Sequence, residues 1–144
     1  ETSLTTLGAV DLYRLISDMV KDGVDLLIME ISAHAIDQKR WEGIYFDALI
    51  FTNCTEDHLD YFGDMDKYSE VKKSIFSFEN CRYMIVNSDD KTGREIIREK
   101  SGNIITYGIE NPADVFAIDI EENKNGVNFV INLFDLFVFS NILP

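Results

Sequence analysis

The sequence predicts an α/β fold, in which a mostly parallel sheet is flanked by helices and followed by a small antiparallel β-ribbon. Short, continuously apolar runs alternate with helical patterns along most of the chain, as expected for parallel strands joined by crossover helices. Near the end, the pattern changes to alternating apolar and polar residues on both sides of Asn125-Gly126, which is a strong hairpin signal.

The composition is that of an ordinary globular domain with an excess of acidic residues. The chain has 144 residues, of which 46% are hydrophobic, so it can bury a core of normal size. Its formal net charge of −13 argues against nucleic acid or an anionic membrane as a partner. No signal peptide or long apolar span is visible. Cys54 and Cys81 show no metal-binding spacing, so reduced cytosolic thiols are expected.

The first part of the chain is expected to form a helix and two buried strands. Thr6 is placed to cap the helix, and Gly23 to end it. Strands are expected over residues 26–29, which lead into Glu30, and over residues 46–51. Both runs have the continuous apolar character of strands that are covered on both faces.

A second helix is expected over residues 64–78, with Asp64 as its N-cap. Its inward stripe consists of Tyr68, Val71, Ile75 and Phe76. Lys72 falls in the same stripe, and its ammonium group either reaches out to water or has a function near His58. The remaining strands, helix and ribbon are expected over residues 83–87, 91–100, 103–107, 115–120 and 127–133.

Two polar residues follow predicted strands, where open parallel sheets bind ligands. Glu30 ends one strand and His58 follows another; each has an ordinary explanation, as a solvated carboxylate or a turn histidine. Together they are too few for structural zinc but suit a hydrated Mg²⁺ that also binds phosphate. Asp57 and Asp60 are further candidate ligands, although Asp57 is better suited to a supporting or turn-forming role. Lys72 would join them only if carboxylated, because an ammonium group has no acceptor atom.

Two motifs resemble those of the Mur ligases. Met29-Glu-Ile-Ser-Ala-His34 resembles their Met-Glu-Val-Ser-Ser-His. Phe51-Thr-Asn-Cys-Thr-Glu-Asp-His-Leu-Asp-Tyr61 resembles their Phe-Thr-Asn-Leu-x-x-Asp-His-Leu-Asp-Tyr. The similarity runs from Thr5 to about Asp90. It is greatest to the members that add the third residue of the peptidoglycan stem peptide.

The resemblance implies the central, ATP-binding domain of a cytoplasmic bacterial amide ligase with a P-loop-like fold. In this family, ATP phosphorylates the carboxylate of UDP-N-acetylmuramoyl-L-alanyl-D-glutamate. The amine of the incoming amino acid then attacks the acyl phosphate, and ADP and phosphate leave. For this chain, the incoming amino acid is expected to be diaminopimelate or lysine. ATP and Mg²⁺ are therefore the implied co-substrate and cofactor. No nucleic acid and no membrane insertion are expected, and the oligomeric state is left open.

The resemblance also implies roles for single residues. Glu30 and His58 match metal ligands of the family, and Lys72 matches a lysine that is carboxylated there. His58 and Lys72 are accordingly the implied catalytic residues as well. The implied contacts to the UDP-muramoyl peptide are Thr5, Thr6, Ser32, Gln38 and Arg40. Arg40 suits a carboxylate or a phosphate because its guanidinium is a fork of donors.

Several features depart from the family pattern. Leu4 stands where the family has asparagine, Ala33 replaces a serine, and Phe62 replaces a histidine. No Gly-Lys-Thr or Gly-Lys-Ser phosphate loop is present, so no nucleotide-binding residues are assigned. Residues 137–143 resemble a segment that opens a later helix. Residues 1–144 are therefore expected to be one incomplete central domain, inactive alone, with the phosphate loop upstream and the C-terminal ligase domain absent.

Two alternatives stay open at this point. A folylpolyglutamate synthase or another Mur ligase would share the fold and the chemistry, although Gln38 and Arg40 favour the third-residue ligase. A non-catalytic module that kept only the fold is the second alternative. The retained metal-type residues argue against such a module, whereas the missing phosphate loop argues for it.

Overall fold

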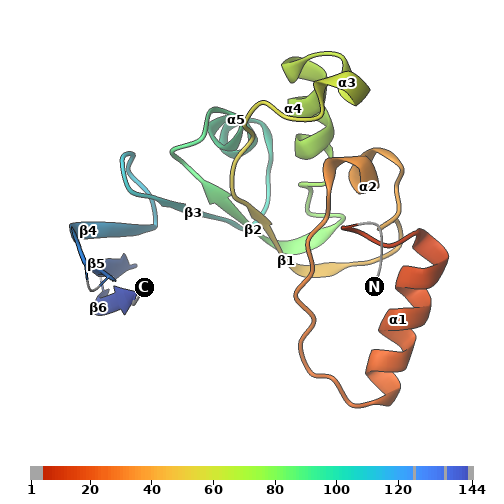
Figure 1. The fold of residues 1–144 in the computed structure, drawn as a ribbon, viewed down its shortest axis with the longest axis horizontal. Coiled ribbons are helices and arrows are strands. Elements are labelled where there is room, and N and C mark those ends of the chain that lie inside the picture. Colours follow the sequence, from red (N-terminus) through yellow and green to blue (C-terminus); the bar gives the residue numbers. More distant parts are fainter. Residues whose placement is uncertain (1–4, 125, 135, 143–144) are drawn as a thin grey trace. The chain divides into compact units, whose positions relative to one another are not determined.

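The computed structural model describes residues 5–124, 126–134 and 136–142, whose helices and strands are labelled in Figure 1. The chain forms two compact units. The first unit runs through Ile44 and includes Glu56–Ile75, and its regular elements are helices. The second unit contains Tyr45–Thr55 and the chain from Phe76 onward, and it holds the sheet. No helix in the described ranges is long and apolar enough to cross a membrane.

Helix α1 (Ala9–Lys21) ends where the sequence predicts. Gly23 follows the helix with φ +75°, a conformation that glycine adopts without strain. The N–H of Gly23 donates to the Val20 carbonyl at 3.2 Å, and the N–H of Val24 donates to the Met19 carbonyl at 3.0 Å. These two bonds form a Schellman motif, which satisfies carbonyl groups of the last turn.

Thr6 does not cap this helix, so that prediction is wrong. Gly8 occupies the N-cap position instead, without a side-chain cap. Thr6 is only 2% exposed, and its hydroxyl donates to the carbonyl oxygen of Glu30 at 3.1 Å. The hydroxyl thus finds its partner in a segment distant in sequence rather than in the first turn of the helix.

The strand predicted over residues 26–29 is also wrong, because residues 24–32 form neither helix nor strand. Leu26 and Ile28 are 74% and 84% exposed. An apolar run becomes a strand only where a neighbouring strand offers hydrogen bonds. Within the described residues, no strand pairs with this stretch.

Three short helices complete the first unit: α2 (Ala33–Asp37), α3 (Leu59–Phe62) and α4 (Met65–Ser74). Asp64 caps α4 as predicted, since its Oδ1 accepts the N–H of Lys67 at 2.8 Å. The helix ends at Ser74 and is thus shorter than predicted. Helices α2 and α3 both contact α4.

The second unit is a six-stranded mixed sheet in the order β1-β2-β3-β4-β5-β6. Its strands are β1 (Phe46–Phe51), β2 (Cys81–Asn87), β3 (Ile104–Gly108), β4 (Val115–Asn123), β5 (Gly126–Leu133) and β6 (Leu136–Ile142). Strands β1 to β4 pair in parallel, and β4 to β6 pair antiparallel. Helix α5 (Lys91–Glu99) connects β2 to β3 and contacts β2. The predicted α/β class with an antiparallel ribbon is therefore confirmed.

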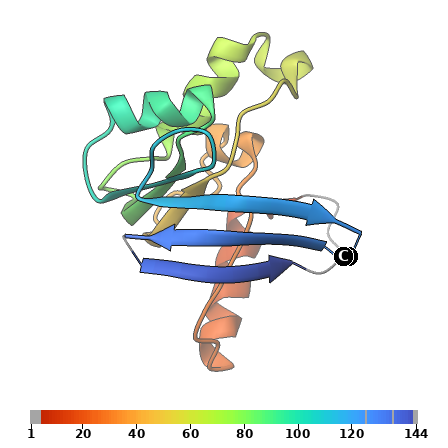
Figure 2. The same ribbon diagram turned by 90° about the vertical axis from the view of Figure 1, so that its left-hand side faces the viewer.

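The antiparallel ribbon is larger than predicted. Strands β4 and β5 pair as expected on both sides of the predicted turn, whose Asn125 lies outside the described residues. Strand β5 also pairs with β6 over its length, so three long strands lie side by side (Figure 2). Residues 137–142 are thus part of a strand and do not begin a helix.

Side chains tie together the carboxyl ends of the parallel strands. Asn87 Nδ2, at the end of β2, donates to the Thr52 carbonyl after β1 at 2.8 Å. The Tyr107 hydroxyl on β3 donates to the carbonyl of Phe51 on β1 at 3.1 Å. Burial is the main cause that raises the pKa of the Tyr107 hydroxyl.

Candidate functional site

The residues implied as metal ligands and as substrate contacts all lie in the first unit. They are Glu30, His58 and Lys72 for the metal, and Thr5, Thr6, Ser32, Gln38 and Arg40 for the substrate. Their exposure differs: Thr5, Glu30 and His58 are exposed, whereas Thr6 is buried. Thr6 therefore supports its neighbours rather than presenting its side chain to solvent.

Thr6 connects the two sets of residues. Its hydroxyl donates to the Glu30 carbonyl at 3.1 Å and accepts the N–H of Ser32 at 3.0 Å. Ser32 in turn caps α2, because its hydroxyl accepts the N–H of Ala35 at 3.3 Å. These bonds fix the backbone that carries the Glu30 carboxylate and leads into α2.

Arg40 extends this network. Its Nε donates to Gln38 Oε1 at 2.9 Å, and its NH2 group donates a second hydrogen bond to the same oxygen. Its NH1 donates to the Thr6 carbonyl at 2.8 Å. The network uses three of the five N–H groups that a guanidinium carries. Arg40, Gln38 and Thr6 thus form one connected set, as a pre-organised substrate contact would require.

His58 stands between the loop after β1 and helix α3, in an unusual conformation. Its φ is +53°, in the left-handed region, and its side chain is 45% exposed. Its backbone N–H donates to Asp57 Oδ1 at 2.8 Å, and its Nε2 lies 3.4 Å from Asp57 Oδ2. The imidazole is therefore accessible to a ligand and has a carboxylate beside it.

An aromatic cluster contacts His58. Its members are His34, Tyr61, Phe62 and Tyr68. The ring centroids of His34 and His58 are 4.9 Å apart, and those of His58 and Tyr68 are 6.4 Å apart. Sequence reasoning gave His34 and Tyr61 no role, although both belong to the two motifs quoted above. Their presence in those motifs was the signal that could have identified them.

Helix α4 carries two adjacent lysines in different environments. Lys72 is half-buried, and its Nζ lies 5.0 Å from the centroid of the Tyr68 ring. Lys73 is 4% exposed and forms an ion pair with Glu70. Tyr68 and Ile75 are buried, as the predicted inward stripe requires. The sequence did not single out Lys73, because helical spacing alone does not show which of two neighbouring positions lies deeper.

Glu30 and His58 fit Mg²⁺ by their chemistry, as one oxygen donor and one nitrogen donor that are both exposed. In the part of the chain that the structure describes, no three histidine, cysteine, aspartate or glutamate side chains gather as a metal cage would require. A sparse protein ligand set suits Mg²⁺, which usually keeps several waters. Lys72 adds oxygen ligands only in its carboxylated form.

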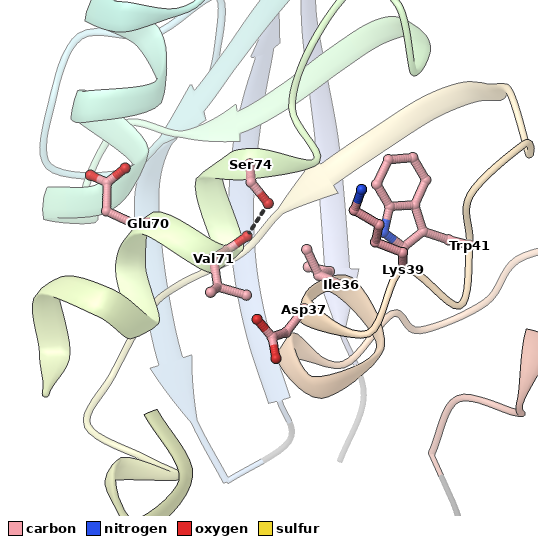
Figure 3. A pocket seen from close by; sticks show the side chains of 7 residues that line it. All are labelled: Ile36, Asp37, Lys39, Trp41, Glu70, Val71 and Ser74. Atoms are coloured by element: carbon pink, nitrogen blue, oxygen red, sulfur yellow. Dashed lines mark hydrogen bonds between the residues drawn. The ribbon is translucent and has the colours of Figure 1, made fainter. Parts of the chain in front are cut away.

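A depression of about 390 Å³ lies between α2 and α4 (Figure 3). It is lined by Ile36, Asp37, Lys39, Trp41, Glu70, Val71 and Ser74. None of the predicted site residues is among them. The depression therefore does not mark the predicted metal or substrate site.

Comparison with known proteins gives one consistent result. The Mur ligase middle domain family matches residues 1–143. The UDP-N-acetylmuramoyl-L-alanyl-D-glutamate–2,6-diaminopimelate ligase of Bacillus cereus is 37% identical over 138 residues, covering 91% of this chain and 28% of the relative. The ligase of the same name from Caldanaerobacter subterraneus subsp. tengcongensis is 35% identical over 134 residues, covering 93% and 28%.

The fold comparison agrees. A solved structure of a ligase with this name superposes with a TM-score of 0.84 and 27% identity, over 94% of this chain and 29% of that chain. The chain thus spans less than a third of the length of these relatives. Because the family match extends over nearly the whole sequence, the chain belongs to the Mur ligase middle domain family.

Proposed function

We propose that this chain is part of an ATP-dependent ligase of peptidoglycan synthesis, which adds the third amino acid to UDP-N-acetylmuramoyl-L-alanyl-D-glutamate. The observation that carries the proposal is the network through Thr6, which links Arg40 of the substrate set to the backbone of Glu30 of the metal set. The names of the relatives specify 2,6-diaminopimelate, so this amino acid is favoured over lysine.

The proposed reaction has two steps. A carboxylate oxygen of the UDP-muramoyl dipeptide attacks the γ-phosphorus of ATP, and ADP leaves. The amine of the amino acid then attacks the acyl carbon, forms the amide bond and expels phosphate. The substrate must be held firmly for both attacks. Arg40 suits this task because Gln38 and Thr6 already orient its guanidinium.

Glu30, His58 and a carboxylated Lys72 are the residues proposed to hold Mg²⁺. When bound, the ion would neutralise phosphate charge during the transfer. Glu30 is carried on a backbone held by Thr6, and the Lys72 side chain lies over the Tyr68 ring. Carboxylation would replace the positive charge of Lys72 with oxygen ligands.

We further propose that residues 1–144 are a portion of the central domain. The phosphate loop and the amino-acid-binding domain would then be supplied by other parts of a cytoplasmic parent enzyme. The coverage of about 28% of the relatives supports this division. On this proposal, the 144-residue chain alone does not turn over ATP.

Arg40→Lys in the full-length parent tests the substrate site. An ammonium group lacks the planar set of donors with which a guanidinium can bond to Gln38 and Thr6 and also bind a carboxylate or phosphate through two hydrogen bonds. We expect the KM for the UDP-muramoyl dipeptide to rise roughly 10-fold or more, with the KM for ATP unchanged. The measurement is phosphate release with ATP and diaminopimelate. Lys39→Met, which removes a neighbouring exposed positive charge, serves as the control. An unchanged KM, or a parent that releases no phosphate, would contradict the proposal.

Lys72 can be tested directly by carbon-13 NMR of the parent in labelled bicarbonate with Mg²⁺. We expect a carbamate signal that Lys72→Ala removes and that Lys73→Met retains. The second variant is the matched control, because Lys73 is the adjacent and more buried lysine of the same helix. A signal that disappears in Lys73→Met and persists in Lys72→Ala would show that the wrong lysine has been assigned.

A further inference from the structure

We propose that His34 is a positioning residue that holds the imidazole of His58 in one orientation. The proposal deepens the function proposed above, and it depends on that function only in taking His58 to bind a cation. The question is what fixes a ring that is exposed on one side and carried by a residue in a rare backbone conformation.

The bonds near His58 act mainly on its backbone. Asp57 accepts the His58 N–H at 2.8 Å, whereas its other carboxylate oxygen is 3.4 Å from Nε2, too long for a strong hydrogen bond. The φ of +53° is uncommon for a residue other than glycine, and such residues often occur at functional sites. With 45% of the side chain exposed, the imidazole needs a packing neighbour to favour one rotamer.

His34 provides this neighbour. The two ring centroids are 4.9 Å apart and the ring planes lie at 77°, which is the edge-to-face geometry that aromatic pairs favour. The Tyr68 ring is the more distant contact of His58, at 6.4 Å. His34 is itself half-buried, and its ring also packs on Tyr61 and Phe62, with centroids 4.3 and 5.3 Å away.

Helix α2, which carries His34, is anchored at both ends. At its start, Ser32 caps the helix and binds Thr6. At its end, Asp37 accepts the hydroxyl of Tyr61 at 3.0 Å. Tyr61 also packs its ring 4.3 Å from His34, and thereby connects α2 to the helix that follows His58. His34 is therefore a fixed surface against which His58 packs.

A ligand that is already oriented binds a cation more tightly than one that must first be ordered. Removing the ring at position 34 should therefore loosen the His58 imidazole and weaken cation binding. A contact of this kind corresponds to a loss of affinity of roughly 2- to 10-fold.

The chain is well suited to a direct test, since it contains only two histidines. Labelling histidine with carbon-13 and nitrogen-15 therefore gives two imidazole side chains, which His34→Leu and His58→Ala assign. Two variants test the order of the His58 ring. His34→Phe keeps an aromatic ring at position 34, and His34→Leu keeps apolar bulk without a ring. Carbon relaxation of the His58 ring is measured in each, in the full 144-residue chain at alkaline pH.

We expect the His34 and His58 rings to be in contact in the unsubstituted protein. The His58 ring should stay ordered in His34→Phe and should become more mobile in His34→Leu. Phe62→Leu is the matched control, because it removes a ring that packs on His34 and leaves both histidines unchanged. The proposal is overturned if His34→Leu leaves the His58 ring as ordered as before, or if Phe62→Leu loosens it equally.

Binding of Mn²⁺ alone, followed by electron paramagnetic resonance, separates this inference from the proposed function. We expect His58→Ala to abolish most of the binding and His34→Leu to weaken it roughly 2- to 10-fold. If His58→Ala has no effect, the cation-binding role of His58 fails, and ring relaxation alone decides the role of His34. If His58→Ala abolishes binding but His34→Leu leaves it unchanged, the positioning role is overturned.

Discussion

Several hydrogen bonds converge on the carboxylate of Asp89, in the loop after β2. The backbone N–H groups of Ile109, Glu110 and Asn111 donate to it at 2.6, 3.1 and 2.8 Å, and the Asn111 amide donates at 2.9 Å. Burial raises the pKa of Asp89, but these donors outweigh it and lower the pKa from 3.8 to about 2. One ionised side chain thus holds the loop between β3 and β4.

Asp89→Asn should destabilise the protein by about 1–2 kcal/mol at neutral pH, because the amide replaces one acceptor oxygen with a donor. Since the pKa of Asp89 is lower in the folded state, its contribution is complete above the unfolded pKa near 3.8 and is lost as the pH falls through about 2. The stability gap between Asp89→Asn and the unsubstituted protein should therefore close on acidification. Urea titrations across this range measure the gap, with Asp25→Asn as the exposed control. A gap that widens towards low pH would contradict the assignment.

At the scale of an element, helix α5 begins at a residue that also holds another loop. Asp90 Oδ1 accepts the N–H groups of Thr92 and Gly93, at 2.7 and 3.1 Å. Its Oδ2 accepts the N–H of Cys54, in the loop after β1, at 3.0 Å. The same first turn is also sterically constrained, because a Cβ at Gly93 would lie 1.9 Å from the Asn87 carbonyl oxygen.

Two substitutions separate the roles of Asp90. Asp90→Ser keeps a capping hydroxyl but loses the second acceptor, and Asp90→Ala loses both. We expect Asp90→Ala to cost about 2 kcal/mol and Asp90→Ser about half of that. Hydrogen exchange of the Cys54 amide should accelerate in both variants, whereas exchange in the first turn of α5 should accelerate only in Asp90→Ala. Equal protection of Cys54 in all three proteins would show that the loop does not depend on Asp90.

At the scale of the whole molecule, the sheet presents a long strand with one neighbour. Strand β6 pairs only with β5 in the described sheet. It carries exposed apolar side chains, including Leu136, Phe137 and Val138 at 70%, 60% and 43%. Such an edge is a template for pairing with another chain. The formal net charge of −13 opposes association, and salt screens that repulsion.

We therefore expect the 144-residue chain to self-associate increasingly as salt is added. Val138→Lys should suppress this association because it places a charge on the edge strand. Ile109→Lys adds the same charge at an exposed loop position and should have a smaller effect. Sedimentation velocity at low and high salt measures the difference. Association that both variants suppress equally would point to net charge rather than to the strand edge.

The sequence by itself predicted the α/β class, the cap at Asp64, the end of α1 at Gly23 and five of the strands that form. Each of these depends on local chemistry: apolar runs, a capping carboxylate, or a glycine at positive φ. Its motifs also indicated the family that the comparison confirmed. Such features can be predicted from neighbouring residues, because the residues that interact to form them are close together in the sequence.

Only the tertiary structure decided the features that depend on partners distant in sequence. Thr6 is a buried link to Glu30 instead of a helix cap, and residues 26–29 are not a strand because no described strand pairs with them. The contact between His34 and His58 joins positions that are separated by a strand and two loops. Hydrogen-bond partners and ring contacts of this kind depend on how distant parts of the chain come together. The local sequence pattern does not specify that arrangement.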